Sequence, residues 1–426
     1  MEKFIIEGGK KLEGEVTPSG NKNSALPILA ACLLTDEEII LHNVPDITDV
    51  ITMRSLLLSL GVKVDYMDGH SWKIHARQVR PADLDPDLTR KIRASILLAG
   101  PMVARAGQLS LPPPGGDVIG RRRVDTHLLA LKKLGATIKY DRSFQFHSRG
   151  LRGTEILLDE ASVTATENAI MACSTAKGKS IIRNAASEPH IQELCHFLNH
   201  LGADICNIGS NTLEINGVLK LHGGEFTIGP DYLEVVSFIG AAIVTRGAIR
   251  IHNAGSEYLS MIRLVFERLG VHWDVEGNDI IVPSRQKLRI EPDLGGAIPE
   301  ISVMPWPAFP TDLMSIAIVV ATQSRGTILF HDWMYPSRMF FTDKLVGMGA
   351  QIVLCDPHRC IVQGPSHFFP EKMESPDIRA GMALLLAALS ASGKSVIRNI
   401  GQIDRGYEKV DLKLKSLGAS IERITE

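Results

Sequence analysis

The sequence predicts an α/β protein of two three-unit domains, in which each unit has a βαβαββ-like order with mixed sheets. Three recurring patterns predict this fold class. Six times a helix ends in Leu-Gly or Met-Gly and a strand follows, with the glycine at Gly61, Gly135, Gly202, Gly270, Gly349 and Gly418. A strand that ends in Asn or Asp precedes five of these copies. An Ala-rich, almost wholly apolar helix precedes those strands in turn, and six copies make coincidence a poor explanation.

Each recurring pattern has a physical reading. The six glycines suit the position after a helix, where left-handed backbone geometry is needed. A helix that is apolar all round must be buried, so the six apolar helices form the cores of the two domains. They begin at polar or charged residues, and helix N-termini that share one cleft attract anions. The polar starts contain Lys22, Asn23, Arg93, Ser162 to Asn168, Asp231, Thr311, Asp312, Asp377 and Arg379.

Composition excludes several classes of protein. The 46 Lys and Arg nearly balance the 48 Asp and Glu, which argues against a general nucleic-acid-binding or membrane-surface protein. The six cysteines form no Cys-x-x-Cys pair and fit reduced thiols in a soluble cytoplasmic protein. The segment from Cys355 to Cys360 predicts a hairpin turn rather than a metal site. No dinucleotide fingerprint follows a strand, and the Gly-Lys-Ser strings at Gly178 and Gly393 predict helix ends rather than phosphate loops. We therefore expect no cofactor and no metal.

One unit departs from the repeat. Where the other units have a strand ending in Asn or Asp, residues 109–120 read LSLPPPGGDVIG, followed by Arg121, Arg122 and Arg123. The glycines permit positive φ and close backbone approach, and Asp117 stands beside three guanidinium groups. A carboxyl next to cations in a loop suggests a lid that carries a proton donor over an anionic substrate. The alternative is a surface turn solvated by its charges.

Several longer motifs give the chain a resemblance to a known family. They are SGNKNSALP, KIRASILLAGPMVAR, PGGDVIG with Arg122 and the following VDTH, PAFPTD and IDRGYE. Over essentially its whole length the chain resembles the UDP-N-acetylglucosamine 1-carboxyvinyltransferases. The sister 3-phosphoshikimate 1-carboxyvinyltransferases share the fold, but their first-helix motif has serine and arginine after the lysine. The resemblance implies an inside-out α/β barrel with one domain at 22–229, carrying the loop 112–123, and a second at 1–21 plus 230–426.

The same resemblance implies a reaction. Enolpyruvyl would pass from phosphoenolpyruvate to the 3-hydroxyl of UDP-N-acetylglucosamine with release of phosphate, the first committed step of peptidoglycan synthesis. That step would tie the protein to cell-wall biogenesis, cell shape and cell division. Phosphoenolpyruvate carries two anionic groups, and arginine can clamp such groups bidentately.

The resemblance also implies roles for individual residues. Asp117 would be the acid and Asp312 the base, with Asp377 and Glu188 as support. Phosphoenolpyruvate would contact Lys22, Asn23, Arg122, Arg338, Arg379 and Arg405, with Lys22 also counted as catalytic. The UDP-sugar would contact Asn23, Arg93, Arg122, Arg123, Val124, Asp125, Thr126, Ser162, Val163, Asp312 and Met334. The alternative for any one of these cations is an ordinary surface ion pair.

Departures from the family pattern cluster on the sugar-nucleotide side. Glu160 stands where lysine is expected, Thr164 replaces a glycine and Arg123 a proline, and further differences occur at Ser187, His190 and Tyr232. Arg123 could offset the repulsion of a diphosphate by Glu160. Two alternative functions therefore stay open. The protein could be an enolpyruvyl transferase that acts on another uridine nucleotide, or a non-catalytic nucleotide-sugar sensor.

The loop acid is a further departure, because cysteine is common in the family at the position of Asp117. Three neighbouring arginines should lower the pKa of that carboxyl, which a bound phosphate would offset. Without a thiolate at this position, we expect the cysteine-alkylating epoxide fosfomycin not to inactivate the protein.

Overall fold

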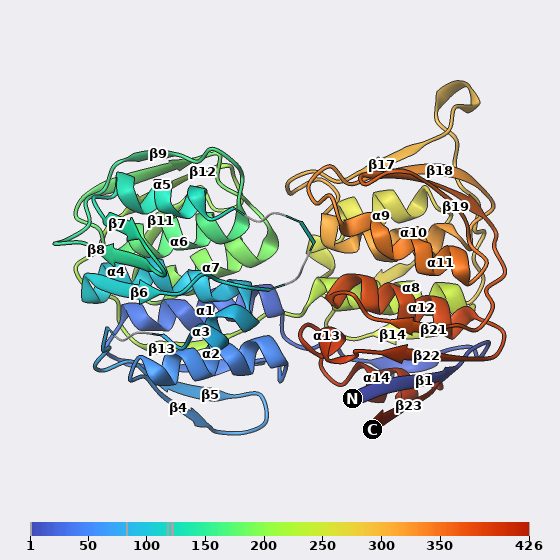
Figure 1. Ribbon diagram of the computed structural model, residues 1–426, viewed down its shortest axis with the longest axis horizontal. Coiled ribbons are helices and arrows are strands. Elements are labelled where there is room, and N and C mark those ends of the chain that lie inside the picture. Colours follow the sequence, from blue (N-terminus) through green and yellow to red (C-terminus); the bar gives the residue numbers. More distant parts are fainter. Residues whose placement is uncertain (1, 82–83, 117–118, 121–122, 426) are drawn as a thin grey trace. The chain divides into compact units, whose positions relative to one another are not determined.

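The computed structural model describes residues 2–81, 84–116, 119–120 and 123–425, and these form two compact units (Figure 1). Unit 1 contains the described residues of 1–19, 118–121 and 230–426. Unit 2 contains those of 20–117 and 122–229. In each unit strands lie at the periphery and helices in the middle (Figure 1).

Unit 2 has three sheets, and each carries one repeat. Their strand orders are β13-β3-β5-β4, β6-β8-β7 and β11-β12-β10-β9. The strands are β3 (Glu38–His42), β4 (Lys63–Tyr66), β5 (Trp72–His75), β6 (Gln108–Leu111), β7 (Thr137–Tyr140), β8 (Phe144–His147), β9 (Glu155–Leu157), β10 (Lys179–Arg183), β11 (Asp204–Cys206), β12 (Thr212–Asn216) and β13 (Gly224–Thr227).

Unit 1 repeats the arrangement and takes two strands from the start of the chain. Its strand orders are β21-β22-β1-β23, β15-β16-β14-β2 and β17-β18-β20-β19. The strands are β1 (Glu2–Glu7), β2 (Glu13–Val16), β14 (Ala248–Ile251), β15 (Asp274–Glu276), β16 (Asp279–Val282), β17 (Glu300–Ser302), β18 (Gly326–His331), β19 (Gln351–Asp356), β20 (Arg359–Gly364), β21 (Lys372–Glu374), β22 (Lys394–Arg398) and β23 (Ser420–Thr425).

The six apolar helices are buried, as their composition predicts. In unit 2 they are α1 (Lys22–Ala31), α4 (Ala99–Ala106) with the preceding 3₁₀ turn η2 (Arg93–Leu98), and α6 (Val163–Ser174). In unit 1 they are α8 (Tyr232–Thr245), α10 (Met314–Ala321) after the turn η5 (Thr311–Leu313), and α12 (Ile378–Ser390), which pack on one another. The remaining helices are α2 (Thr48–Ser59), α3 (Pro86–Lys91), α5 (Asp125–Lys133), α7 (Pro189–His200), α9 (Ser260–Glu267), α11 (Thr342–Gly347), α13 (Gly401–Asp404) and α14 (Val410–Ser416).

Backbone angles confirm two of the repeated patterns. All six predicted helix-end glycines have positive φ, from 81° at Gly270 to 104° at Gly349. The four asparagines that end the repeated strands, Asn43, Asn184, Asn253 and Asn399, also have positive φ, between 47° and 57°. Asparagine tolerates this region better than most residues because its short polar side chain can hydrogen-bond locally. The repeated sequence patterns thus mark equivalent turns.

The irregular unit is irregular in structure as well. The other five sheets each contain one parallel strand pair, whereas the sheet β6-β8-β7 is antiparallel throughout. After β6 the chain meets α3, where Gly115 N–H donates to Thr89 O and Gly116 N–H to Arg90 O, both at 3.3 Å. A Cβ on Gly115 would lie 1.7 Å from Arg90 O, so close approach requires glycine there.

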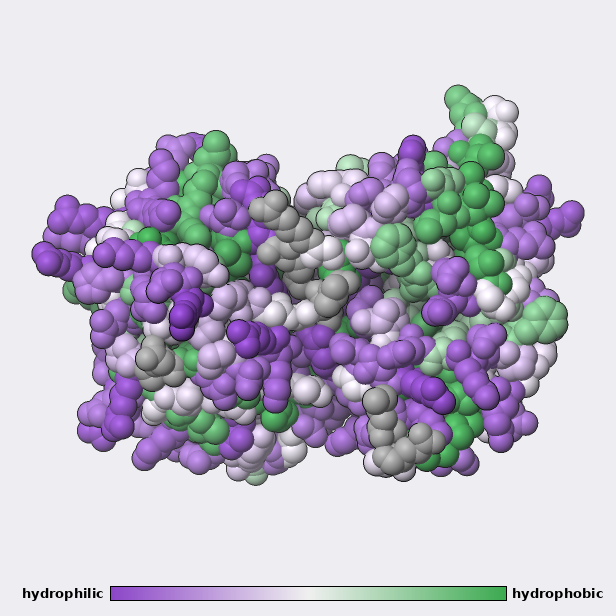
Figure 2. All heavy atoms as spheres, in the orientation of Figure 1, coloured by the Kyte–Doolittle hydropathy of each residue, from purple (hydrophilic) through white to green (hydrophobic). Residues whose placement is uncertain are grey.

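The surface gives two more observations. The loop between β16 and β17 projects from unit 1, and its residues Leu294 and Ile298 are exposed at 101% and 60% (Figure 2 shows apolar surface on this projection). Cys32, Cys173, Cys195 and Cys360 are buried, whereas Cys206 and Cys355 are exposed. Within the described residues no helix is long and apolar enough to cross a membrane.

Candidate active site

Three of the predicted site residues in unit 1 meet at the start of α10. Asp312, in η5, accepts from Arg338 Nη2 at 3.0 Å and from Arg379 Nη2 at 3.3 Å, one bond to each carboxylate oxygen. Both guanidinium groups are buried, while the side chain of Asp312 remains 31% exposed. The cluster therefore presents one accessible carboxylate backed by two buried cations.

Arg379 is held from more than one side. It lies in the first turn of α12, where Asp377 caps the helix by accepting from Arg379 N–H at 2.8 Å. Its Nη1 donates to Tyr407 Oη at 3.5 Å, and that hydroxyl lies 2.8 Å from Ser237 Oγ in α8. Arg405 lies two residues before Tyr407 and donates to Gln402 Oε1 at 3.0 Å. The IDRGYE motif thus supplies both a predicted ligand and an aromatic support for Arg379.

The charges of this cluster are mutually stabilised. Burial opposes the charge of Arg338, but Asp312 and Asp377 raise its pKa above the ordinary value. Burial likewise opposes the charge of Arg379, and Asp312 is the largest contribution that raises its pKa. Because nearby carboxylates keep Arg338 and Arg379 ionised despite burial, both guanidinium groups are available to an anionic substrate group.

A second carboxylate positions the segment that contains Met334. Asp332 stands where other repeats have the turn asparagine, and its Oδ1 accepts from Met334 N–H at 3.0 Å. Its Oδ2 accepts from Thr311 Oγ1 at 2.5 Å, which ties this turn to η5. Burial raises the pKa of Asp332. Asp332 therefore has a positioning role that the sequence reading did not assign.

In unit 2, Lys22 opens α1 and forms an ion pair with Asp49 at 2.7 Å between Nζ and Oδ2. Both side chains are buried. Asn21 caps the helix by accepting from Asn23 N–H at 2.8 Å and from Ser24 N–H at 3.3 Å. Asp49, at the start of α2, was missed because nothing in its local sequence signals a partner for Lys22.

The predicted UDP-sugar residues at the start of α5 form a charged network. Arg93 Nη2 donates to the backbone oxygen of Arg123 at 2.6 Å. Arg123 pairs with Asp125 at 3.2 Å and with Asp159 at 3.1 Å, and Asp159 also accepts from Thr126 Oγ1 at 2.7 Å. Asp159 was missed by the sequence reading. Since Arg123 is already paired with two carboxylates, its capacity to offset Glu160 is smaller than the sequence suggested.

A buried polar network connects α5 with α6. Asn168 Nδ2 donates to Ile96 O at 2.9 Å and lies 2.8 Å from His127 Nδ1. Because an amide nitrogen only donates, His127 Nδ1 must accept, so its proton is on Nε2. That Nε2 lies 3.1 Å from Thr164 Oγ1. The departure from glycine at position 164 thus supplies an acceptor to a neutral histidine.

This network predicts a specific loss of stability in acid. Burial, with a smaller effect from Arg93, lowers the pKa of His127 to about 3, against 6.5 in the unfolded chain. Between these two pKa values the unfolded state binds more protons than the folded state. The contribution of His127 to the free energy of unfolding is therefore fully present above pH 6.5 and decreases as the pH falls. From pH 7 to pH 5, we expect His127 to contribute a loss of about 2 kcal/mol in the free energy of unfolding.

Urea unfolding of the wild type and of His127→Gln, each at pH 7 and pH 5, measures this contribution. The variant should lose about 2 kcal/mol less on acidification, because it has no imidazole to protonate. Equal losses in the two proteins would show that His127 takes no part in the acid sensitivity.

Most of the remaining predicted site residues lie at or just before the start of a helix. Val124 and Ser162 are the residues before α5 and α6, and Val163 is the first residue of α6. Glu188 precedes α7, near the departures Ser187 and His190, and Tyr232 opens α8. Asp117 and Arg122 lie outside the described residues. Among the described residues no group of three or more His, Cys, Asp or Glu side chains is placed to hold a metal ion.

Comparisons with known proteins identify the class first. A family model described as EPSP synthase (3-phosphoshikimate 1-carboxyvinyltransferase) matches residues 6–414. The enolpyruvyl transferase NikO from Streptomyces tendae superimposes with a TM-score of 0.89 at 25% identity, covering 100% of this chain and 99% of that one. EPSP synthase from Acinetobacter baumannii superimposes with a TM-score of 0.77 at 17% identity over 100% of both chains. The fold is that of the enolpyruvyl transferases, which confirms the predicted inside-out α/β barrel.

Full-length relatives then identify the family. UDP-N-acetylglucosamine 1-carboxyvinyltransferase from Bradyrhizobium diazoefficiens is 55% identical over 423 residues, 99% of this chain and 98% of the relative. The protein of the same name from Treponema denticola is 53% identical over 422 residues, 99% of each chain. This chain belongs to the UDP-N-acetylglucosamine 1-carboxyvinyltransferase family.

Proposed function

We propose that this protein transfers enolpyruvyl from phosphoenolpyruvate to the 3-hydroxyl of UDP-N-acetylglucosamine and releases phosphate, the first committed step of peptidoglycan synthesis. The observation that carries the proposal is the contact of Asp312 with two buried arginines in a member of this family. We also place the reaction in the cytoplasm, without a cofactor. The near balance of charged residues and the free cysteines favour that setting.

The reaction requires a base for the acceptor hydroxyl, an acid for phosphoenolpyruvate and cations for its charged groups. The acceptor oxygen forms a bond to C2 of phosphoenolpyruvate while its proton leaves and C3 gains a proton. Loss of the C3 proton and of phosphate then gives the enol ether. We assign Asp312 as the base for the hydroxyl and Asp117 as the acid toward C3. The buried Arg338 and Arg379 would hold the substrate carboxylate, because guanidinium groups bind carboxylates bidentately.

The remaining assignments follow the same proposal. Lys22, Asn23, Arg122 and Arg405 would bind phosphoenolpyruvate chiefly through its phosphate. The UDP-sugar would use the network around Arg93, with the residues that begin α5 and α6. We further propose that unit 2 is the domain expected at 22–229 and unit 1 the domain expected at 1–21 plus 230–426.

Phosphate release tests the function and its alternatives together. Purified protein is incubated with phosphoenolpyruvate and, in separate reactions, with UDP-N-acetylglucosamine, UMP or buffer alone. Release that requires the sugar nucleotide supports the proposal. Release only with UMP would select another uridine nucleotide as acceptor, and no release would select a sensor. The 55% identity to a protein named UDP-N-acetylglucosamine 1-carboxyvinyltransferase favours the first outcome.

The loop acid predicts the response to fosfomycin. Incubation with this epoxide should leave wild-type phosphate release unchanged, since a carboxylate replaces the thiolate it would alkylate. Burial raises the pKa of Cys173, Cys195 and Cys360 to about 12, which disfavours their thiolates, and the exposed Cys206 and Cys355 are not among the predicted site residues. The variant Asp117→Cys should instead lose activity progressively with time. Time-dependent inactivation of the wild type would contradict the prediction.

A further inference from the structure

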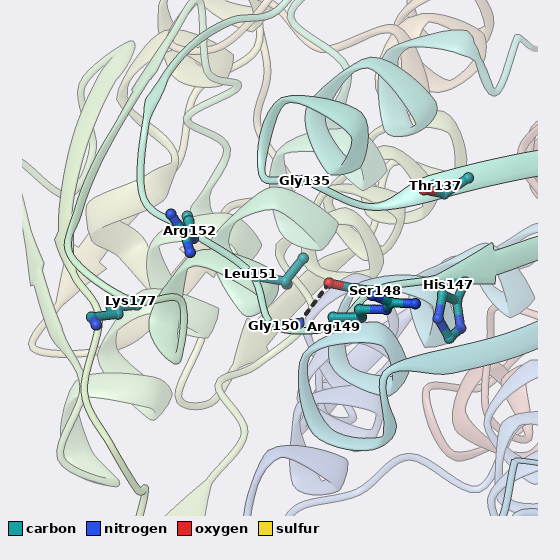
Figure 3. Close-up of a pocket in the computed structure, with 9 residues that line it drawn as sticks. All are labelled: Gly135, Thr137, His147, Ser148, Arg149, Gly150, Leu151, Arg152 and Lys177. Carbon is teal, nitrogen blue, oxygen red and sulfur yellow. Dashed lines mark hydrogen bonds between the residues drawn. The ribbon is translucent and has the colours of Figure 1, made fainter.

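A cavity of about 590 Å³ lies in unit 2, and none of the predicted site residues that the structure describes lines it. Its walls come from the start of β7, the end of β8, the segment after β8 and the turn after α6 (Figure 3). Arg149 and His147 lie on one side of Leu151, and Arg152 and Lys177 lie on the other (Figure 3). Cationic side chains thus flank the cavity on two sides.

The chain concentrates positive charge in this region although its formal net charge is −2. Residues 132–152 contain six cations and a single carboxylate, Asp141. The six are Lys132, Lys133, Lys139, Arg142, Arg149 and Arg152. The equivalent hairpins of two other repeats carry the opposite charge, with Asp204 and Glu214 in one and Asp274, Glu276 and Asp279 in the other. The basic character therefore belongs to this repeat and not to the fold.

The cavity cations are not neutralised as their neighbours are. On the adjoining strand β10, Lys179 pairs with Glu214 at 2.5 Å, and Arg183 pairs with Glu155. Within the described part of the chain, Arg149, Arg152 and Lys177 take part in no ion pair. Three unpaired cations around one cavity repel one another, so an anion bound among them would relieve that repulsion.

The backbone that carries these side chains is fixed. Arg152 N–H donates to Leu134 O at 3.0 Å, and Lys177 N–H donates to Leu151 O at 2.9 Å. Ser148 N–H donates to Gly107 O at 2.7 Å, and Leu151, which also lines the cavity, is buried. Because the backbone is already fixed, a ligand would not have to order it on binding. This favours a defined ligand site over a diffuse patch of surface charge.

We propose that this cavity binds a small molecule that carries two or more phosphate groups. Its volume lies within the range of about 300 to 1,000 Å³ that is usual for ligand pockets. Arg149 on one side and Arg152 on the other supply planar, bidentate donors for phosphate oxygens, and Lys177 adds a point charge on the side of Arg152. The site is separate from the residues assigned to enolpyruvyl transfer and does not depend on that assignment.

Hydrogen–deuterium exchange of the full-length protein with inorganic pyrophosphate tests the proposal locally. Peptides covering residues 147–153 and 175–179 should become protected in a saturable way. This local signal separates the cavity from any pyrophosphate bound at the candidate active site. The triple variant Arg149→Ala/Arg152→Ala/Lys177→Ala should bind at least about tenfold more weakly, as expected for loss of charge-assisted bonds.

The matched control is Lys133→Ala/Lys139→Ala/Arg142→Ala, which removes the same charge from exposed positions outside the cavity lining. It should change the affinity by less than about twofold, because these side chains do not line the cavity and act on its ligand only through screened, longer-range attraction. Equal weakening in both triple variants would show diffuse attraction and overturn the proposal, as would the absence of local protection in the wild type. Should the first variant fold poorly, Arg149→Lys/Arg152→Lys keeps the charge and should still weaken binding through loss of the planar donors.

Protection by anionic phospholipid vesicles without protection by pyrophosphate would also overturn the proposal, because the cavity would then serve as part of a membrane-binding surface.

Discussion

Replacement of Asp312 by asparagine is expected to lower kcat by about 10³-fold, within the range typical of a lost general base. The amide is nearly isosteric with the carboxylate but cannot accept the proton of the acceptor hydroxyl. Phosphate release from saturating substrates measures the effect, and binding of UDP-N-acetylglucosamine should be largely unchanged.

The exposed residue Asp343 provides the control, since Asp343→Asn makes the same chemical change in α11 of the same unit. It should leave kcat unchanged. Because Asp312 also lies between two buried arginines, the thermal unfolding of both variants must be compared. A normal kcat in Asp312→Asn would show that another group is the base.

Replacement of Arg379 by lysine should raise the KM for phosphoenolpyruvate by about 10- to 100-fold while affecting the KM for the nucleotide sugar little. Lysine keeps the positive charge near Asp312 but has no second planar donor for the substrate carboxylate. Removing the charge altogether would leave Asp312 less well paired, so lysine is the more informative change. Steady-state kinetics with each substrate varied in turn separate the two effects.

Arg359→Lys is the matched control for this prediction. Arg359 also pairs with a carboxylate, Asp356 at 2.7 Å, but it is exposed at the start of β20. Its replacement should change neither KM by more than about twofold, because exposed pairs contribute little. A raised KM for the nucleotide sugar alone in Arg379→Lys would move Arg379 to the acceptor side.

The repeat was predictable from sequence because each recurring residue type has a cause within a few residues of it. A glycine such as Gly61 is required by left-handed geometry after a helix, and that requirement recurs wherever the helix ends. The caps Asp231 and Asp377 likewise satisfy helix N–H groups within three residues. The glycines of the loop also have local causes, because Gly115 lies close to the backbone of Arg90 and Gly116 has positive φ.

The partners of the site residues were not predictable in this way. Asp312 contacts an arginine 26 residues away and another 67 residues away, and only the folded chain brings them together. The partner of Lys22, Asp49, and the acceptor of Thr126, Asp159, carry no local signal in the sequence. The cavity near Arg149 was missed for the same reason, because Lys177 joins it from a different repeat. Family resemblance supplied the roles of residues, while the structure supplied their contacts.

The mass of the nucleotide product tests enolpyruvyl transfer most directly. Protein, phosphoenolpyruvate and UDP-N-acetylglucosamine are incubated together. The nucleotide is then isolated and its molecular mass is measured by mass spectrometry. The account predicts that the sugar nucleotide gains one enolpyruvyl group for each phosphate released. Release of phosphate with an unchanged sugar nucleotide, or no release at all, would contradict it.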